Sequence, residues 1–402
     1  MKKFTYKARD KASERIVESI VQAESESSAA KVLLEQGFVP LEIKEEDGSD
    51  SFLSKLQNRI TTKDKIVFTR QLATLIGAGL PLSQSLRTVL DQTSNKRMQA
   101  IIQEVIADVE GGKQLSEAFG KHRDVFDKIF LALVTAGEAS GTLDEALKRI
   151  AAQQEKDAAM MSKIKGALTY PVIVLFVIMG VMIFMLVAVV PQVEKLYQDM
   201  NQTLPLLTQI MIGISTFITK YWGLLLIALA IGGYFFVQWA RTDDGIRAVD
   251  SFKLNVPMFK GMFRKLYMAR FTRTGQTLLA TGVAMLDMLR ISGEGVSNVR
   301  IKDGIDRAAE KVKGGKALSS SLESEDYILP MVPQMIKIGE QSGKIDEMMG
   351  KTAQVYEDEL DEEIRTLSTA IEPVLMVVLA VVAGGMVGAI LFPIYALVGS
   401  IR

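Results

Sequence analysis

Residues 171–191, PVIVLFVIMGVMIFMLVAVVP, decide the fold class because no charged side chain interrupts them. They lie in an uncharged segment, 166–193, and two similar segments follow at 221–240 and 373–401. As helices rising about 1.5 Å per residue, all three are long enough to cross a hydrocarbon core of ~30 Å. A shorter apolar stretch at 204–218 carries polar side chains, and we assign it to the membrane interface. The sequence predicts three transmembrane helices, at residues 168–192, 220–240 and 373–399.

Lysine and arginine are distributed unevenly around these helices. Between the uncharged segments 166–193 and 221–240, the only basic residues are Lys195 and Lys220. Basic side chains are frequent just after the second of these segments. Basic flanks mark the cytoplasmic side of a membrane, so we predict a cytoplasmic N-terminus and an extracytoplasmic C-terminus. The remaining domains are predicted as follows: a small cytoplasmic α+β domain and linker at 1–60, a cytoplasmic helical domain at 61–165, a periplasmic loop with an interfacial segment at 193–219, and a second cytoplasmic helical domain at 241–370.

The chain also contains an internal repeat. At an offset of 203 residues, Phe68-Thr69-Arg70 matches Phe271-Thr272-Arg273. At an offset of 202, Gly137-Glu138-Ala139-Ser140-Gly141 matches Gly339-Glu340-Gln341-Ser342-Gly343, and Pro171 matches Pro373. Each repeat therefore contains a cytoplasmic domain and the membrane helix that follows it. Both repeats lead outward through the membrane, so one inward crossing is needed between them, which agrees with three spans.

Local patterns predict the structure inside the repeats. Apolar residues in 96–110 recur with the spacing of an amphipathic helix, and glycine-rich breaks divide each unit into five or six short helices. The N-terminal residues have a different pattern from the repeats. We predict a short hairpin from residues 4–8 and 16–21, followed by a helix at 27–36 and a polar linker at 47–54. The predicted fold is mainly α: an integral membrane protein with two homologous helical bundles in tandem and a small N-terminal α+β cap.

Composition excludes several classes of function. The 47 basic and 47 acidic side chains balance, which gives no sign of a nucleic-acid partner. The chain has no cysteine and a single histidine, His122, so we predict no catalytic site, no cofactor and no metal centre of the usual ligand types. We interpret His122 as an exposed loop residue. The three uncharged segments, 166–193, 221–240 and 373–401, contain no Asp, Glu, Lys or Arg, which argues against a membrane transporter.

Two Gly-Gly-Lys sequences invite comparison with a phosphate-binding loop. The Walker pattern needs a glycine five positions before its second glycine and a hydroxyl residue after its lysine. Ala107 and Gln114 occupy these positions in the first copy, and Glu310 and Ala317 in the second. We therefore interpret both sequences as helix-ending turns.

The G-E-x-S-G motif, followed by Asp-Glu in both copies, is the richest polar motif. The first interpretation is a tight turn between helices, with a capping box at Thr142 in the first copy only. The second is a surface that contacts a partner, and the third is a site for a hard cation with oxygen ligands. The candidate contact residues are Glu138, Ser140, Asp144, Glu145, Glu340, Ser342, Asp346 and Glu347.

Two further features lie near the third span. An acidic run just before it, Asp358 to Glu363, is interpreted as a solvated helix face or, alternatively, as a docking surface that the first repeat lacks. Inside the span, Gly384 and Gly388 have the spacing that allows two helices to approach closely in lipid. We predict that these glycines pack against another helix, within the chain or between copies.

The whole chain resembles the type II secretion system F family. The resemblance rests on the duplicated helical domain and on motifs in both repeats: 68–75 (FTRQLATL), 163–171 (KIKGALTYP), 189–191 (VVP), the second G-E-x-S-G and Glu372-Pro373. Within the family, residues 204–208 and 220–223 are most similar to the platform proteins of type IV pili, and the secretion-system homologues are close.

The resemblance implies an inner-membrane platform protein without known catalysis. Its implied partners are a cytoplasmic hexameric ATPase for assembly or retraction (PilB- or PilT-like), pilin or pseudopilin subunits, other inner-membrane alignment-complex proteins and the lipid bilayer. It also implies a homo-oligomer. Type IV pilus assembly, type II secretion and DNA uptake all stay open at this point, and a transporter is a remote alternative.

Overall fold

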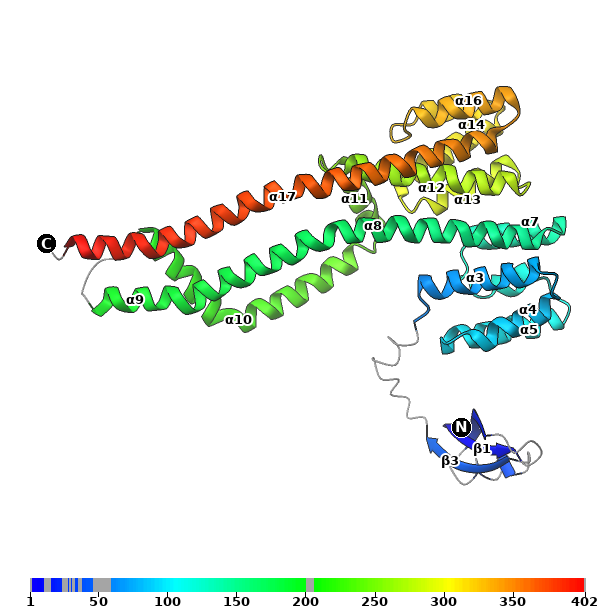
Figure 1. Cartoon of the computed structure of the whole chain (residues 1–402), viewed down its shortest axis with the longest axis horizontal. Coiled ribbons are helices and arrows are strands. Elements are labelled where there is room, and N and C mark those ends of the chain that lie inside the picture. The colour runs from blue at the N-terminus through cyan, green and yellow to red at the C-terminus, as the bar shows by residue number, and fades with distance from the viewer. Residues whose placement is uncertain are drawn as a thin grey trace. The chain divides into compact units, whose positions relative to one another are not determined.

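The computed structural model describes residues 2–10, 16–23, 28, 30, 33–34, 38–45, 59–199 and 206–400. Figure 1 shows the helices and strands of the chain. The chain divides into two units. The first comprises residues 1–64 and 93–101, and the second comprises 65–92 and 102–402. The predicted linker at 47–54 lies outside the described residues.

The N-terminal part of the first unit is a small antiparallel sheet. Strands β1 (Lys2–Asp10), β2 (Ile16–Ala23) and β3 (Phe38–Glu45) pair in the order β2-β1-β3, with an irregularity in the β1–β3 register at Lys7 and Ala8. The predicted hairpin is confirmed as β1 and β2. Those residues of the predicted helix at 27–36 that are described are helical, and one of them, Leu33, is buried with Ala8 and packs near Phe38.

Repeat 1 consists of six consecutive helices. They are α3 (Thr62–Gly77), α4 (Leu82–Gln92), α5 (Lys96–Glu110), α6 (Leu115–Gly120), α7 (Lys128–Ser140) and α8 (Leu143–Phe184). Gly79, Gly112 and Gly141 adopt positive φ angles of 86°, 87° and 72° at the breaks between helices, which glycine tolerates without a Cβ clash. The predicted breaks are therefore real chain reversals.

Repeat 2 has the same order of helices. After α11 (Asp243–Asn255) come α12 (Lys260–Ala280), α13 (Met285–Gly295), α14 (Val299–Lys313), α15 (Leu318–Glu323), α16 (Met331–Ser342) and α17 (Ile345–Ser400). Gly282, Gly315 and Gly343 repeat the positive φ angles at 83°, 88° and 71°. The tandem repeat is confirmed in three dimensions.

Three helices among the described residues are long and apolar enough to cross a membrane. α8 continues through a π-helical turn, Met185–Val189, into α9 (Val190–Asp199), and α10 spans Leu206–Trp239. All three helices have large apolar side chains on their surface that no other part of the described chain covers. Examples are Phe176 (75% exposed), Leu229 (75%) and Val381 (70%). Such continuous apolar surface suits lipid rather than water.

The helix α10 begins earlier than the predicted second span. It joins the predicted interfacial segment to that span without a break, and Ser215 in this segment donates a hydrogen bond to the carbonyl of Leu186 at 2.5 Å. This carbonyl belongs to the π-helical turn, in which the Val190 amide bonds to the Met185 carbonyl. The next amide along would be that of Pro191, which has no N–H, so the Leu186 carbonyl is available. The domain boundaries proposed from the sequence stay predictions.

Candidate functional site

Each G-E-x-S-G turn links a short helix to the long helix that leads toward the membrane. In repeat 1, α7 ends at Ser140, Gly141 is left-handed and α8 begins at Leu143. In repeat 2, α16, Gly343 and α17 follow the same path. The two turns are therefore the points at which the bundles connect to the membrane helices.

The glutamate of each turn holds the start of another helix. The Glu138 carboxylate accepts hydrogen bonds from the backbone amides of Leu115 and Ser116, at 2.5 and 2.9 Å, at the N-terminus of α6. Glu340 accepts the equivalent bonds from Leu318 and Ser319 at α15, at 2.6 and 3.2 Å, and a third from the Ser319 hydroxyl at 2.5 Å. A carboxylate is well suited to this place because it pairs with free amides and with the positive end of the helix dipole. Each glutamate thus has a structural role, and a contact with a partner stays a prediction.

The first glycine of each turn has a steric role. A Cβ on Gly137 would lie 2.7 Å from the Cβ of Ala146, and one on Gly339 would lie 2.7 Å from the Cα of Ile345. The start of each long helix therefore crosses the preceding helix at a distance that only glycine permits.

The expected capping box at Thr142 is absent, and this prediction was wrong. Thr142 makes no side-chain cap hydrogen bond, and its hydroxyl lies 2.7 Å from the hydroxyl of Ser140. The Ser140 hydroxyl also donates to the carbonyl of Ala136 at 2.8 Å, as Ser342 does to Ile338 at 2.9 Å. The two serine hydroxyls therefore bond to carbonyls in the last turn of the preceding helix.

The serines of the turns, Ser140 and Ser342, are exposed, and each acidic pair after a turn has one exposed member. Asp144 and Asp346 are half-buried, whereas Glu145 and Glu347 are exposed on the first turns of α8 and α17. Glu347 forms ion pairs of 3.3 and 3.1 Å with Lys344 and Lys351. Within the described part of the chain, no group of three or more His, Asp or Glu side chains is arranged to hold a metal ion.

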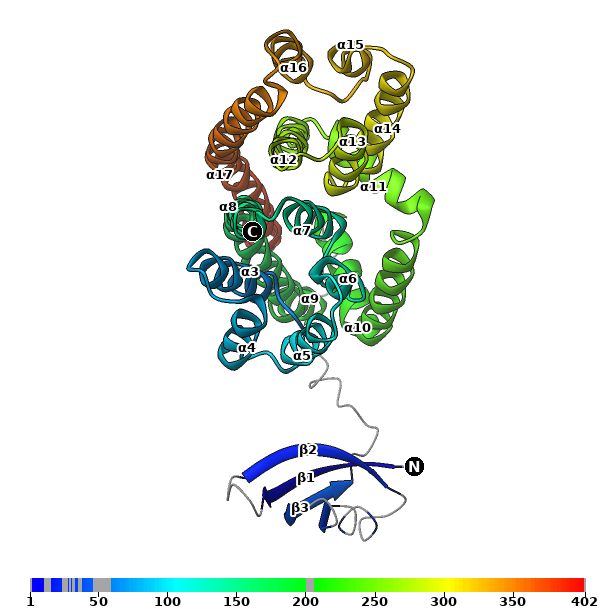
Figure 2. The same cartoon turned by 90° about the vertical axis from the view of Figure 1, so that its right-hand side faces the viewer.

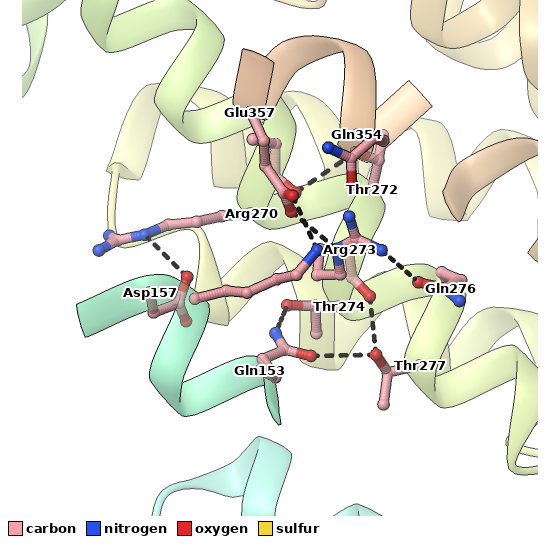
Figure 3. Close-up of polar contacts among 12 residues, drawn as sticks. Gln153, Asp157, Arg270, Thr272, Arg273, Thr274, Gln276, Thr277, Gln354 and Glu357 are labelled. Atoms are coloured by element: carbon pink, nitrogen blue, oxygen red, sulfur yellow. Dashed lines mark hydrogen bonds and ion pairs between the residues drawn. The ribbon is translucent and has the colours of Figure 1, made fainter. Parts of the chain in front are cut away.

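A polar interface between the two repeats was not foreseen from the sequence (Figure 3). Glu357 of α17 pairs with Arg273 of α12 at 2.8 Å and with Lys156 of α8 at 2.9 Å. Beside them, the buried Gln153 side chain donates to the Thr274 hydroxyl at 2.7 Å and accepts from the Thr277 hydroxyl at 3.1 Å. One carboxylate and one amide therefore join α8 of repeat 1 to α12 and α17 of repeat 2.

One ion pair of this interface is itself duplicated. At the repeat offsets, Arg273 and Glu357 match Arg70 and Glu155, which also form an ion pair. The Arg273 side chain is 15% exposed, whereas Arg70 is 65% exposed. The signal was present in the sequence, because Arg70 lies in the matched F-T-R motif and Glu155 matches Glu357 at the offset of 202.

Another pair of facing residues is duplicated, with the glutamate at the opposite position. At the offset of 203, Glu104 and His122 match Arg307 and Glu325. The His122 Nε2 atom lies 3.1 Å from the Glu104 carboxylate, and Arg307 donates to Glu325 at 2.9 Å. The prediction that His122 is exposed was wrong, because only 16% of its side chain is accessible. The backbone at His122 forms the same turn as the backbone at Glu325 in repeat 2. This turn places the His122 ring next to α5.

We expect repeat 2 to lose stability in acid through Glu325. Burial raises the pKa of this carboxyl, but hydrogen bonds from Arg307 and Lys311 outweigh burial and hold the pKa below its usual 4.5. A carboxylate with a lowered pKa stabilises the fold fully above 4.5, and this contribution is lost as the pH falls through the lowered value. The melting temperature of the full chain should therefore fall more steeply below pH 4.5 than that of a Glu325→Gln variant.

The matched control for this prediction is Glu323→Gln, two residues earlier and exposed. Its melting curve should follow the wild-type pH dependence. If Glu325→Gln also follows the wild type below pH 4.5, the carboxylate does not stabilise repeat 2.

The acidic run before the third span divides between two environments. Glu359 and Glu363 pair with Lys265 at 3.3 and 2.6 Å, and Asp361 pairs with Lys163 of repeat 1 at 2.5 Å. Asp358 and Glu362 are exposed. Part of the run is therefore an internal contact, and part is an open acidic surface.

The glycines of the third span have no close neighbour within the described part of the chain. A Cβ on Gly384 or Gly388 would meet no described atom within 4 Å. Close packing at these glycines between copies stays a prediction.

The chain is similar to known proteins along nearly its whole length. A family model described as type II secretion system (T2SS), protein F, matches twice, at residues 68–191 and 271–393, and the model of its N-terminal domain matches residues 1–44. The chain is 37% identical to the type IV pilus assembly protein PilC of Thermus thermophilus, covering 99% of this chain and 98% of that protein. It is 33% identical to PilC of Pseudomonas aeruginosa, covering 91% and 97%, and 34% identical to the type II secretion system protein F of that organism, covering 99% of both.

Proposed function

The chain belongs to the type II secretion system protein F family, and we propose that it is the inner-membrane platform protein of a type IV pilus assembly machine. The observation that carries the proposal is 33–37% identity to proteins named PilC over most of the chain. Secretion-system F proteins match at 32–34%, so type II secretion is the alternative.

We propose a mechanical role rather than a catalytic one. The two helical repeats would contact a cytoplasmic hexameric ATPase, and the membrane helices would contact pilin subunits that enter or leave the membrane. The N-terminus and both repeats would then lie in the cytoplasm and the C-terminus outside. Basic flanks around the first two spans support this orientation.

The arrangement of the long helices supports this role. α8 and α17 each begin at a G-E-x-S-G turn and continue into an apolar segment, and the helix does not end at the internal Pro171 or Pro373. A displacement at the turn would therefore reach the membrane along a continuous helix. The ion pairs at Glu357 would make the two repeats move together.

The experiment replaces the exposed acidic residues at both turns. In a strain without the gene, the wild-type chain should restore surface pili, and a Glu145→Lys, Glu347→Lys double variant should not. We expect recruitment of the ATPase to membranes to fall by about tenfold or more, because two repulsive contacts of ~1 kcal/mol each replace attractive or neutral ones. Pilus counts and membrane-bound ATPase are the measurements.

The controls separate contact from folding. Reversing Glu138 or Glu340 would remove a helix cap, so Glu138→Gln and Glu340→Gln, which keep an acceptor oxygen, should retain pili. The amount of chain in the membrane must be equal for all variants. Full piliation in the double variant would rule out the turns as the contact, and loss of secretion without loss of pili in the deletion strain would favour the secretion alternative.

A further inference from the structure

The contact between the repeats joins unlike faces. Repeat 1 contributes its α7–α8 face, which includes Ile129, Gln153 and Lys156. Repeat 2 contributes its α12–α13 face, which includes Thr277 and Gly295, together with Glu357 at the edge of α17. Figure 2 shows α7 and α8 beneath α12 and α13 in the view along the long helices. This is a head-to-tail contact.

A head-to-tail contact between two repeats leaves one face of each kind unused. The unused faces are the α3–α4 face of repeat 1, which matches α12–α13, and the α16–α17 face of repeat 2, which matches α7–α8. If these faces are complementary, the contact within one chain can recur between chains.

The α3–α4 face of repeat 1 is open among the described residues. Val67 is 43% exposed, and Arg70 is 65% exposed where its match Arg273 is covered by repeat 1. A groove of about 580 Å³ lies beside them, lined by Thr74, Asp144 and the Arg70–Glu155 pair.

The α16–α17 face of repeat 2 is open as well. Val355, the match of the buried Gln153, is 38% exposed, and Asp358, the match of Lys156, is exposed. A groove of about 650 Å³ lies beside this face, between α15 and α16, and is lined by residues that include Ser320, Pro333 and Lys337. In repeat 1 the matching segment carries Lys128, which pairs with Glu294 of repeat 2 at 2.7 Å.

We infer that the α16–α17 face of one copy packs on the α3–α4 face of a second copy, in the way that α7–α8 packs on α12–α13 within the chain. The charges are complementary. Lys156 pairs with Glu357 inside the chain, so the equivalent Asp358 would lie beside the Arg70–Glu155 pair. Asp358 is acidic where the matching Lys156 is basic. It would therefore pair with the exposed Arg70 of the second copy, as Lys156 pairs with Glu357 within the chain.

The membrane is compatible with this association. α8 and α17 run alongside each other in the same direction (Figure 1), so the relation between the repeats keeps both bundles at the same end of the membrane helices. A further copy added by the same relation would stay on that side too. A head-to-tail contact that includes a rotation closes into a ring when the rotation permits it.

The test uses cysteine pairs in the full-length chain, which has no cysteine of its own. Thr277 and Gln153 are hydrogen-bonded, and their matches are Thr74 and Val355. Two differently tagged chains, one with Thr74→Cys and one with Val355→Cys, are produced together in membranes and mildly oxidised. We expect a mixed disulfide between the tags and none when either chain is produced alone.

Control variants complete the test. Gln103→Cys, exposed on α5, should not link to Val355→Cys. Arg70→Asp should lower the yield of the mixed disulfide about three- to tenfold, and Asp358→Arg in the partner chain should restore it. A disulfide-linked dimer formed when only one of the two substituted chains is produced would show that identical faces are in contact. That result would overturn the inference. Absence of any mixed disulfide would also overturn the inference. This holds whether Thr74→Cys reacts with a thiol reagent or is shielded by the N-terminal segment or another protein.

Discussion

Replacing Glu357 with alanine is expected to destabilise the full-length protein by about 2–4 kcal/mol. The carboxylate is 13% exposed and is the shared partner of Arg273 and Lys156. Its removal leaves the Arg273 guanidinium, 15% exposed, with only Gln276 as an acceptor at 3.0 Å among the described residues. An uncompensated charge in a mostly dry interface costs more than the ion pair itself contributes, because the desolvation cost is no longer offset. Thermal unfolding of the full-length chain in detergent measures the loss.

The repeat provides the matched control. Glu155→Ala breaks the equivalent pair, but water reaches both partners, so a loss of about 0–1 kcal/mol is expected. Lys156→Ala removes only the contact between repeats and leaves Arg273 paired, so its effect should also be small. Equal losses for Glu155→Ala and Glu357→Ala would mean that burial at the interface does not set the cost.

The three membrane helices, the helix at 96–110 and the tandem repeat were predicted correctly. The three membrane helices follow from uncharged length, and the helix at 96–110 follows from the spacing of residues such as Ile102 and Val105. The repeat follows from identities at constant offsets. Each of these signals depends on neighbouring residues or on alignment of the chain with itself, so no knowledge of packing is required.

The hydrogen bonds of Glu138 and Gln153 could not be predicted because their partners are distant in sequence. Glu138 lies 23 residues from Leu115, and Gln153 lies 121 residues from Thr274. Thr142 has the spacing of a capping box, yet its hydroxyl is held near Ser140. Sequence spacing shows which residues can bond locally, whereas the folded backbone decides which acceptor lies nearest.

Replacing Gly339 with valine is expected to cost about 3 kcal/mol, and replacement with alanine somewhat less. The nearest atoms to a new Cβ are the Cα and N of Ile345, at 2.7 and 3.2 Å, and the carbonyl of Lys344, at 3.2 Å. All three belong to the backbone of the turn and of α17, so no flexible side chain can move aside. The start of α17 must shift, which also disturbs the amides held by Glu340. Amide hydrogen exchange should show the loss first in α15 and at the start of α17.

The sign of the alanine effect distinguishes steric crowding from helix propensity. Alanine is favoured over glycine inside a helix by up to ~1 kcal/mol, so a glycine without close neighbours gains stability when it is replaced. Gly77, at the end of α3, is such a position, because a Cβ added there would meet no described atom within 4 Å. Gly77→Ala should therefore leave the melting temperature unchanged or raise it, whereas Gly339→Ala should lower it. If both substitutions raise it, then α17 can move away from α16 at little cost, and the turn is a hinge rather than a rigid junction.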